Sequence, residues 1–305
     1  MKGNSMKVSF LSYRLIVTLS SLIFMSACST LSEKKHVNAD NALLSQTPKK
    51  AITIASAIPV LDSMARVLAE NSVFETVYIP PARYSIKRIP GWLKRQDKQT
   101  FPDADIALGM TSVWPSIDIY PAIRLKNIGV IEIDAAHALI PNGERVAVTP
   151  NSDNVDYFWL NPANAIMMLG IIHRDLLAVS KRKIIDHALL TKTLDQLNAN
   201  FNEISQALRK VQLEIDNKLN QIEVLQVVID KPEQKALADA IGVPLTTLDD
   251  PMIEDFPILF ITTKKPNHKS LIKLPKSALV WHIDAIDKFS EKGLLERYQE
   301  LYDGL

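Results

Sequence analysis

Several residues with metal-binding side chains lie close to apolar runs that resemble strands. His282 and Asp284 are two positions apart at the end of one such run, so on a strand both side chains point to the same face. Imidazole nitrogens and carboxylate oxygens are ligands that zinc and other divalent ions take in proteins. The candidate metal ligands in this sequence are therefore Asp284, Asp230, His282, Asp156 and His137. For each histidine, an ordinary hydrogen-bonded role is the alternative.

A cluster of basic residues follows the second predicted strand. Arg83, Lys87 and Arg88 lie in one loop that contains no histidine. Clustered positive charge disfavours a cation, whereas arginine and lysine are natural partners of carboxylate and phosphate groups. These three residues therefore indicate an anion-binding loop, with an ordinary solvated loop as the alternative.

The motif content favours a binding protein over an enzyme. No P-loop, GxSxG, HExxH or paired-cysteine motif occurs in the sequence, and no nucleophile–base pair stands out at a motif spacing. The 35 basic and 34 acidic residues balance, and no polybasic stripe indicates a nucleic-acid partner. We expect neither catalysis nor nucleic-acid binding.

The first 28 residues have the pattern of an export signal. Three basic residues precede an apolar stretch, residues 15–24, that is too short to span a membrane comfortably. The stretch ends at Met25-Ser26-Ala27-Cys28, which contains the only cysteine of the chain. This segment resembles a bacterial lipobox, in which the cysteine is acylated; an ordinary signal peptide with a chance cysteine is the alternative. Polar residues 29–49 then predict a flexible tether. We expect an exported protein that is lipid-anchored through Cys28 at a bacterial membrane, facing the periplasm or the cell exterior.

The remainder of the chain alternates between short apolar runs and helical patterns. This alternation predicts an α/β fold with two parallel-sheet lobes, because parallel strands need helical crossovers. The predicted lobes cover residues 50–180 and 221–305. The predicted strands are 51–56, 73–79, 106–109 and 130–133 in the first lobe, and 224–230, 258–261 and 278–284 in the second. A final helix is predicted over residues 286–302.

Between the lobes lies a long helical stretch, about residues 181–220. Its apolar side chains recur at steps of three and four, which places them on one stripe of a helix. These residues are Leu190, Leu194, Leu197, Phe201, Ile204, Leu208, Val211 and Ile215. Such a helix can be half of a coiled coil or a rigid backbone that ties two lobes together. An α/β lobe on each side favours the second arrangement, and with it a monomer.

The segment Trp159-Leu160-Asn161-Pro162, followed by Asn164-Ala165, comes just before this helical region. At this segment and in its order of elements the chain resembles the zinc- and manganese-binding lipoproteins of ABC importers, the TroA/ZnuA-like solute-binding proteins. The resemblance implies two lobes joined by one long rigid backbone helix. It also implies Zn or Mn captured between the lobes, and an ABC permease in the membrane as partner.

The metal-ligand positions that the resemblance implies are mostly replaced in this chain. Tyr157 and Tyr84 lie where histidine ligands are expected, while Asp284 fits the position of the carboxylate ligand and Asp230 lies near that of another histidine. The sequence therefore leaves two functions open. One is a metal-binding solute-binding protein; the other is a divergent relative that binds an anionic or organic ligand, or a protein partner, in place of a free metal ion.

Overall fold

The computed structural model describes residues 51–138, 144–146, 156–249, 257–263, 274–276 and 278–305. The chain divides into two compact units, Met1–Lys49 and Lys50–Leu305. The predicted export signal, Cys28 and the predicted tether lie outside the described residues. A form that lacks residues 1–28 therefore keeps the whole of the second unit.

The first sheet is parallel, with the strand order β2-β1-β3-β4. Its strands are β1 (Ile52–Ser56), β2 (Phe74–Tyr78), β3 (Ile106–Gly109) and β4 (Ile131–Asp134), in agreement with the sequence prediction. β3 is buried along its whole length, as expected for a central strand that is covered on both faces. Because all four strands run in the same direction, the loops that follow them meet at one edge of the sheet.

Short helices connect these strands. The α-helices are α1 (Pro59–Ala69), α2 (Ile89–Leu93) and α3 (Tyr120–Arg124), and the 3₁₀ turns are η1 (Ile86–Arg88), η2 (Lys98–Thr100), η3 (Pro115–Ile117) and η4 (Phe158–Leu160). α1 begins with Pro59 at its first position, where a proline costs no helical hydrogen bond. The loop after β2 is thus folded into η1 and α2.

The second sheet is also parallel, with the strand order β6-β5-β7-β8. It contains β5 (Gln226–Ile229), β6 (Leu245–Thr246), β7 (Ile258–Thr262) and β8 (Leu279–His282), together with η5 (Pro232–Gln234) and α6 (Lys235–Ile241). The last helix, α8, covers Leu294–Asp303. The prediction that this helix begins near residue 286 was wrong, because residues 284–293 are not helical and contain a turn at Ile286.

Two helices occupy the region of the predicted backbone helix. α4 covers Pro162–Lys183 and α5 covers His187–Ile222, so the predicted start at Lys181 was wrong. Ile184 has an extended backbone, and the Asp186 carboxylate accepts a hydrogen bond from the Leu189 amide at 2.9 Å. This side-chain cap begins a new helix. The 36 residues of α5 correspond to a length of about 54 Å.

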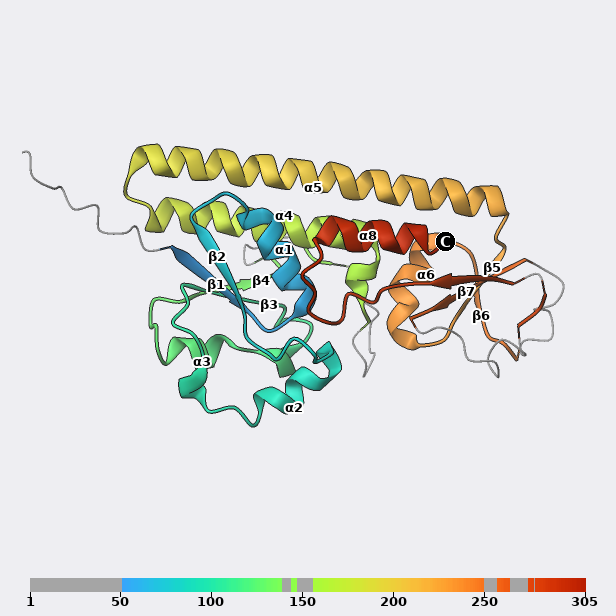
Figure 1. Ribbon diagram of the computed structural model, residues 1–305, viewed down its shortest axis with the longest axis horizontal. Helices are drawn as coiled ribbons and strands as arrows, with labels where there is room; N and C mark the ends of the chain where they lie inside the picture. Colours follow the sequence, from blue (N-terminus) through green and yellow to red (C-terminus); the bar gives the residue numbers. More distant parts are fainter. Residues whose placement is uncertain (1–50, 139–143, 147–155, 250–256, 264–273, 277) are drawn as a thin grey trace, which may run out of the picture. The chain divides into compact units, whose positions relative to one another are not determined.

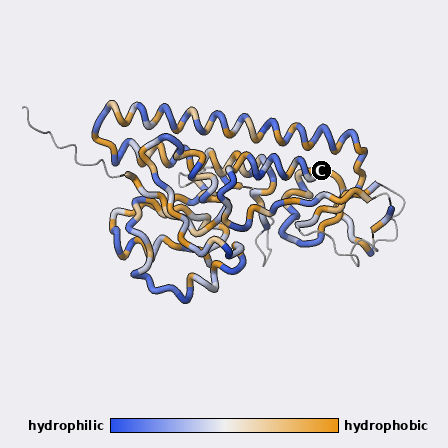
Figure 2. Tube along the Cα trace, viewed as in Figure 1, coloured by the Kyte–Doolittle hydropathy of each residue, from blue (hydrophilic) through white to orange (hydrophobic). Residues whose placement is uncertain are grey.

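The apolar stripe of α5 is covered within the chain itself. Its buried residues include Leu197, Ile204, Leu208, Val211 and Ile215, and α5 contacts α4, α8 and α1. Figure 1 shows α4 and α8 running alongside α5. In Figure 2, α5 alternates between hydrophilic and hydrophobic residues along its length, whereas the strands are mostly hydrophobic. The helix is therefore a backbone element and not half of a coiled coil, which confirms the predicted fold class.

One hydrophobic core connects the two sheets. It includes Ile54 and Leu108 of the first sheet, Leu208 of α5, and Leu259 and Trp281 of the second sheet. Within the described residues, α4 is the one helix long and apolar enough, by length and composition, to cross a membrane. Half of its most apolar stretch is buried in the fold. Such burial is typical of a core helix.

Candidate functional site

A pocket of about 560 Å³ lies where segments that follow the strands of both sheets come together. Its walls come from the loop after β2, the segment before η4, and the segments after β5, β7 and β8. The lining residues are Ser85, Lys87, Tyr157, Lys231, Glu233, Gln234, Thr263, His282, Ile283, Asp284, Ala285, Asp287, Lys288 and Glu300. This is the edge at which open α/β sheets bind ligands.

An ion pair crosses the pocket between segments that are far apart in the sequence. The Lys87 ammonium, on η1, donates to Oε1 of Glu233, on η5. The Glu233 side chain is only 7% exposed, and within the described part of the chain its Oε2 atom has no hydrogen-bond partner. The Glu233 carbonyl accepts from the Tyr157 amide at 3.0 Å. Glu233 thus joins three walls of the pocket and leaves one buried carboxylate oxygen unsatisfied.

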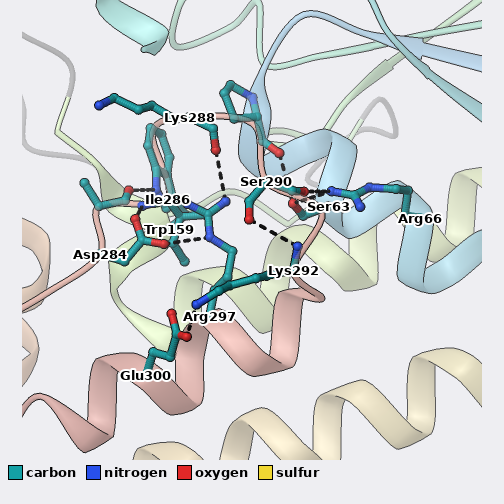
Figure 3. Close-up of polar contacts among 12 residues, drawn as sticks. Ser63, Arg66, Trp159, Asp284, Ile286, Lys288, Ser290, Lys292, Arg297 and Glu300 are labelled. Carbon is teal, nitrogen blue, oxygen red and sulfur yellow. Dashed lines mark hydrogen bonds and ion pairs between the residues drawn. The ribbon is translucent and has the colours of Figure 1, made fainter. Parts of the chain in front are cut away.

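Asp284, the candidate carboxylate ligand, has both of its oxygens occupied. Oδ2 accepts from Nε of Arg297 at 2.7 Å, and Oδ1 accepts from the Ile286 amide at 2.9 Å. Arg297 is buried and also donates to the Lys288 carbonyl at 3.1 Å. Figure 3 shows Asp284 between the Ile286 amide and the Arg297 guanidinium. In this arrangement Asp284 holds together the turn that forms one wall of the pocket.

This turn contains a strained residue. Ile286 is fully buried and has a φ of 51°, a left-handed conformation that costs about 1–2 kcal/mol in an L-residue. A β-branched side chain is rare in this conformation. The hydrogen bond from the Ile286 amide to Asp284 stabilises the turn. Strain of this kind concentrates at functional sites and persists where surrounding contacts enforce it.

Residues 284–293 are also tied to the first sheet and its helices. The Trp159 indole donates to the Ala285 carbonyl at 3.0 Å, and Arg66, on α1, donates to the Ser290 carbonyl at 2.6 Å. Tyr298, on α8, donates its hydroxyl to the Trp159 carbonyl. Figure 3 shows Arg66 and Arg297 on opposite sides of this segment. We call residues 284–293 the crossing segment.

The Trp159–Pro162 motif has a structural role in this fold. Trp159 is buried and stacks against Tyr157 with ring centroids 4.8 Å apart. The Asn161 side chain accepts from the Ala163 amide at 2.9 Å, so it caps α4 directly before Pro162. Asn164 donates to the Phe158 carbonyl at 3.0 Å. The motif therefore fixes Tyr157 at the pocket wall and anchors the crossing segment.

Asp230 lies at the end of β5 and also has internal partners. Its carboxylate accepts hydrogen bonds from the Gln234 amide group and from the Thr262 hydroxyl, the latter at 2.8 Å. Lys231 points into the pocket wall and donates to the Thr263 hydroxyl at 3.2 Å. Asp230 is thus used to hold η5 against the second sheet.

The remaining candidate ligands are spread over the structure. His282 is exposed and lines the pocket with Asp284. Asp156 is buried outside the pocket lining, and His137 follows β4, where it forms a β-bridge with Arg145. Within the described ranges, no three histidine, cysteine, aspartate or glutamate side chains come together in a group that could hold a metal ion.

Some of the basic and aromatic candidates line the pocket, and others lie outside its lining. Of the three basic residues, Lys87 lines the pocket. The guanidinium carbons of Arg83 and Arg88 lie 5.5 and 4.4 Å from the ring centroid of Tyr84, outside the pocket lining. Tyr157 is in the pocket wall, and burial, together with the charge of Asp287, raises the pKa of its hydroxyl. Tyr157 is therefore a neutral hydroxyl at ordinary pH.

Sequence reasoning missed Glu300, on α8, and four ionisable pocket residues that follow strands: Lys231, Glu233, Asp287 and Lys288. Burial raises the pKa of the Asp287 carboxyl; Lys288 opposes this shift and Asp284 adds to it. All four residues lie within a few positions of a strand end, after β5 or β8. Their position behind parallel strands was the signal that could have found them.

No protein-family model matches the chain, and no curated protein matches it. Solved structures do resemble it. The solute-binding protein FpvC of Pseudomonas aeruginosa in complex with Mn²⁺ is 13% identical with a TM-score of 0.56, over 84% of this chain and 97% of that one. The zinc-bound ZnuA-like domain of Streptococcus pneumoniae AdcA is 12% identical with a TM-score of 0.54, over 83% and 97%.

A crystal structure of ZnuA is 13% identical with a TM-score of 0.52, over 83% of this chain and 96% of that chain. FpvC has also been solved with Ni²⁺. These likenesses span nearly the whole of each neighbour, and at such low identity they establish the architecture. The described part of the chain therefore has the fold of the TroA/ZnuA-like metal-binding solute-binding proteins, as its sequence predicts.

Proposed function

We propose that the chain is an extracytoplasmic solute-binding protein that captures its ligand in the pocket between the two sheets and delivers it to a membrane ABC permease. The observation that carries this proposal is the pocket itself, which lies at the carboxyl ends of two parallel sheets in a fold shared with solute-binding proteins. The carboxylates of Asp284 and Asp230 serve in fixed contacts, which supports binding rather than catalysis.

A divalent metal ion is the first candidate ligand, because the similar structures include zinc-bound and manganese-bound proteins. Zn or Mn would contact His282, whose side chain is exposed in the pocket. Asp284 accepts one hydrogen bond on each oxygen, from Arg297 and from the Ile286 amide, and each oxygen keeps a lone pair for a metal ion. The adjacent Arg297 charge would weaken such a contact.

A solute other than a free metal ion is the second candidate. The specific observation that favours it is the ion pair in which the Lys87 ammonium already neutralises Glu233. Because its charge is already balanced, the Glu233 carboxylate attracts a divalent cation less than an unpaired carboxylate would. Among the residues that the structure describes, the pocket also offers no group of three metal-binding side chains.

Metal binding is tested on the chain that lacks residues 1–28. Zn²⁺ or Mn²⁺ at one hundred times its Kd should stabilise the folded protein by about 2.7 kcal/mol, measured by thermal unfolding. The metal candidate predicts that His282→Ala removes this shift, while His187→Ala, on the exposed start of α5, leaves it intact. Absence of a shift with both metals, together with no metal in the purified protein, would exclude the first candidate and favour the second.

The lipid anchor is part of the same proposal and needs its own measurement. Acylation of Cys28 predicts that the full chain incorporates labelled palmitate and partitions into detergent. The matched variant Cys28→Ser should lose both properties while Lys50–Leu305 keeps its fold. Label incorporation that is equal in the two proteins would contradict the anchor.

A further inference from the structure

The pocket lining contains three lysines and four carboxylates. Two of these carboxylates pair with Arg297 and Lys292, which lie outside the lining, so the lining and these two partners together carry five positive and four negative charges. Asp284 is paired with Arg297, Glu233 with Lys87, and Glu300 with Lys292. By contrast, Lys231 and Lys288 form no ion pair with any described residue, although both line the pocket.

These two lysines reach the pocket from different segments. Lys231 follows β5 and is half-buried, whereas Lys288 is exposed on the crossing segment. In Figure 3 the Lys288 side chain points away from Arg297, although its carbonyl accepts a hydrogen bond from that residue. Two lysines from separate walls can therefore approach one anionic group.

Asp287 is the fourth carboxylate of the pocket wall. Its pKa is raised by burial and lowered by the neighbouring Lys288 charge. Asp287 therefore offsets one of the two lysine charges, and one positive charge remains.

Glu233 adds a second requirement for the ligand. Its side chain is more than nine-tenths buried at the pocket wall, and its buried Oε2 atom has no hydrogen-bond partner among the residues that the structure describes. A buried carboxylate oxygen is strongly stabilised by a hydrogen-bond donor. A hydroxyl or amino group of a ligand in the pocket would supply this donor.

The size of the pocket limits the ligand further. A cavity of about 560 Å³ lies within the range of pockets that hold small organic molecules, roughly 300–1,000 Å³. A single dehydrated ion would leave most of this space to water. The volume therefore favours a molecule of several heavy atoms.

We propose that the ligand is a small carboxylate or phosphate compound that also carries a hydroxyl or amino donor. This inference rests on the proposed solute-binding function. Lys231 and Lys288 bind its anionic group, and the free oxygen of Glu233 accepts its donor. Lys87 holds Glu233 in place and balances its charge, so the carboxylate attracts divalent cations less. The site thus selects a molecule that carries both features.

The test uses the chain without residues 1–28 in metal-free buffer, with calorimetry and thermal unfolding. L-Malate and succinate form one pair of probes that differ by a hydroxyl group, and glycerol 3-phosphate and inorganic phosphate form the phosphate pair. We expect the hydroxyl-bearing member of at least one pair to bind more tightly, on the order of tenfold. The pair that binds identifies the anionic group.

Three variants complete the experiment. Lys231→Ala combined with Lys288→Ala should weaken binding of the anion by at least roughly tenfold. Glu233→Gln should reduce the preference for the hydroxyl-bearing probe. Lys235→Ala serves as the matched control, because Lys235 lies on the neighbouring helix α6 and is paired with Asp239 outside the pocket lining.

The inference is overturned if none of the four probes binds at 10 mM (roughly the weakest affinity of interest), or if the double lysine variant binds them as tightly as the unmodified protein. If zinc or manganese then stabilises the same preparation against thermal unfolding, the solute-binding function is still supported and only the anionic ligand class is excluded. Failure of both metals and all four anions, with no small molecule found on the purified protein by native mass spectrometry, would count against the proposed function itself.

Discussion

Replacement of Asp284 by alanine separates a structural role of this residue from a role as metal ligand. The substitution removes the hydrogen bonds from Arg297 and from the Ile286 amide. It leaves the Arg297 guanidinium with 3% side-chain exposure and without its carboxylate partner. The strained turn at Ile286 loses the contact that stabilises it.

The magnitude follows from the burial of the two partners. Removal of one member of a buried ion pair costs about 3–5 kcal/mol. Because the Asp284 side chain is 35% exposed, water reaches the vacated position and the cost falls toward the lower end of this range. The loss of the hydrogen bond to the Ile286 amide adds about 1 kcal/mol. We expect Asp284→Ala to lower the free energy of unfolding by about 4 kcal/mol in total, which corresponds to a decrease in Tm of about 8–16 °C.

The assay is urea unfolding of the metal-free chain without residues 1–28, followed by tryptophan fluorescence. Asp239→Ala is the control, because its ion pair with Lys235 is exposed and should contribute no more than about 0.5 kcal/mol. Arg297→Met combined with Asp284→Ala should recover part of the loss, since no buried charge then remains unpaired. If Asp284→Ala loses less than about 1 kcal/mol in the absence of metal, the structural role assigned to Asp284 is refuted.

Three further predictions concern the core and the pH dependence of stability. Leu208→Ala, on the buried stripe of α5, should cost about 2–5 kcal/mol, whereas Leu213→Ala, which is 59% exposed, should stay within about 0.5 kcal/mol in the same urea titration. Tyr298→Phe should cost about 1–2 kcal/mol because it leaves the buried Trp159 carbonyl without its donor, which chemical denaturation also measures. Burial raises the pKa of Asp287 above its usual value of 3.8, so the folded protein binds this proton more tightly than the unfolded chain. Stability from this group is therefore present at low pH and lost as pH rises through the folded pKa. Asp287→Asn should therefore stabilise the protein, relative to the unmodified chain, more at pH 7 than at pH 4. Unfolding midpoints of the variant that match those of the unmodified protein across this range would contradict this.

The α/β architecture could be predicted from the sequence because its signals are local. The apolar run of β3 gave the observed strand Ile106–Gly109, and the steps of three and four gave the buried stripe of α5. The break between α4 and α5 was missed, since neither glycine nor proline marks it. Asp186, which caps α5, was the available signal, because aspartate is a preferred residue at helix starts.

The start of the last helix was mispredicted for a different reason. Residues 284–293 carry apolar side chains that fit a helix, but Trp159, Arg66 and Arg297 donate hydrogen bonds to carbonyl groups of this segment and hold it in a non-helical form. These partners come from distant segments, so no local pattern reports them. Tertiary contacts override local preference at this wall of the pocket.

The sequence by itself determined two parallel sheets, a long one-faced helix and the segments that follow the strand ends, since hydrophobic periodicity depends only on neighbouring residues. Only the tertiary structure decided which charges remain available in the pocket. Lys87 and Glu233 are 146 positions apart, and Asp284 is occupied by Arg297 from another element. Whether a carboxylate can bind a ligand depends on the charge packed against it, and that neighbour is set by the fold. For this reason Asp284 and Asp230 looked like ligands in the sequence, while Lys231, Lys288 and the free oxygen of Glu233 emerged only when the pocket was assembled.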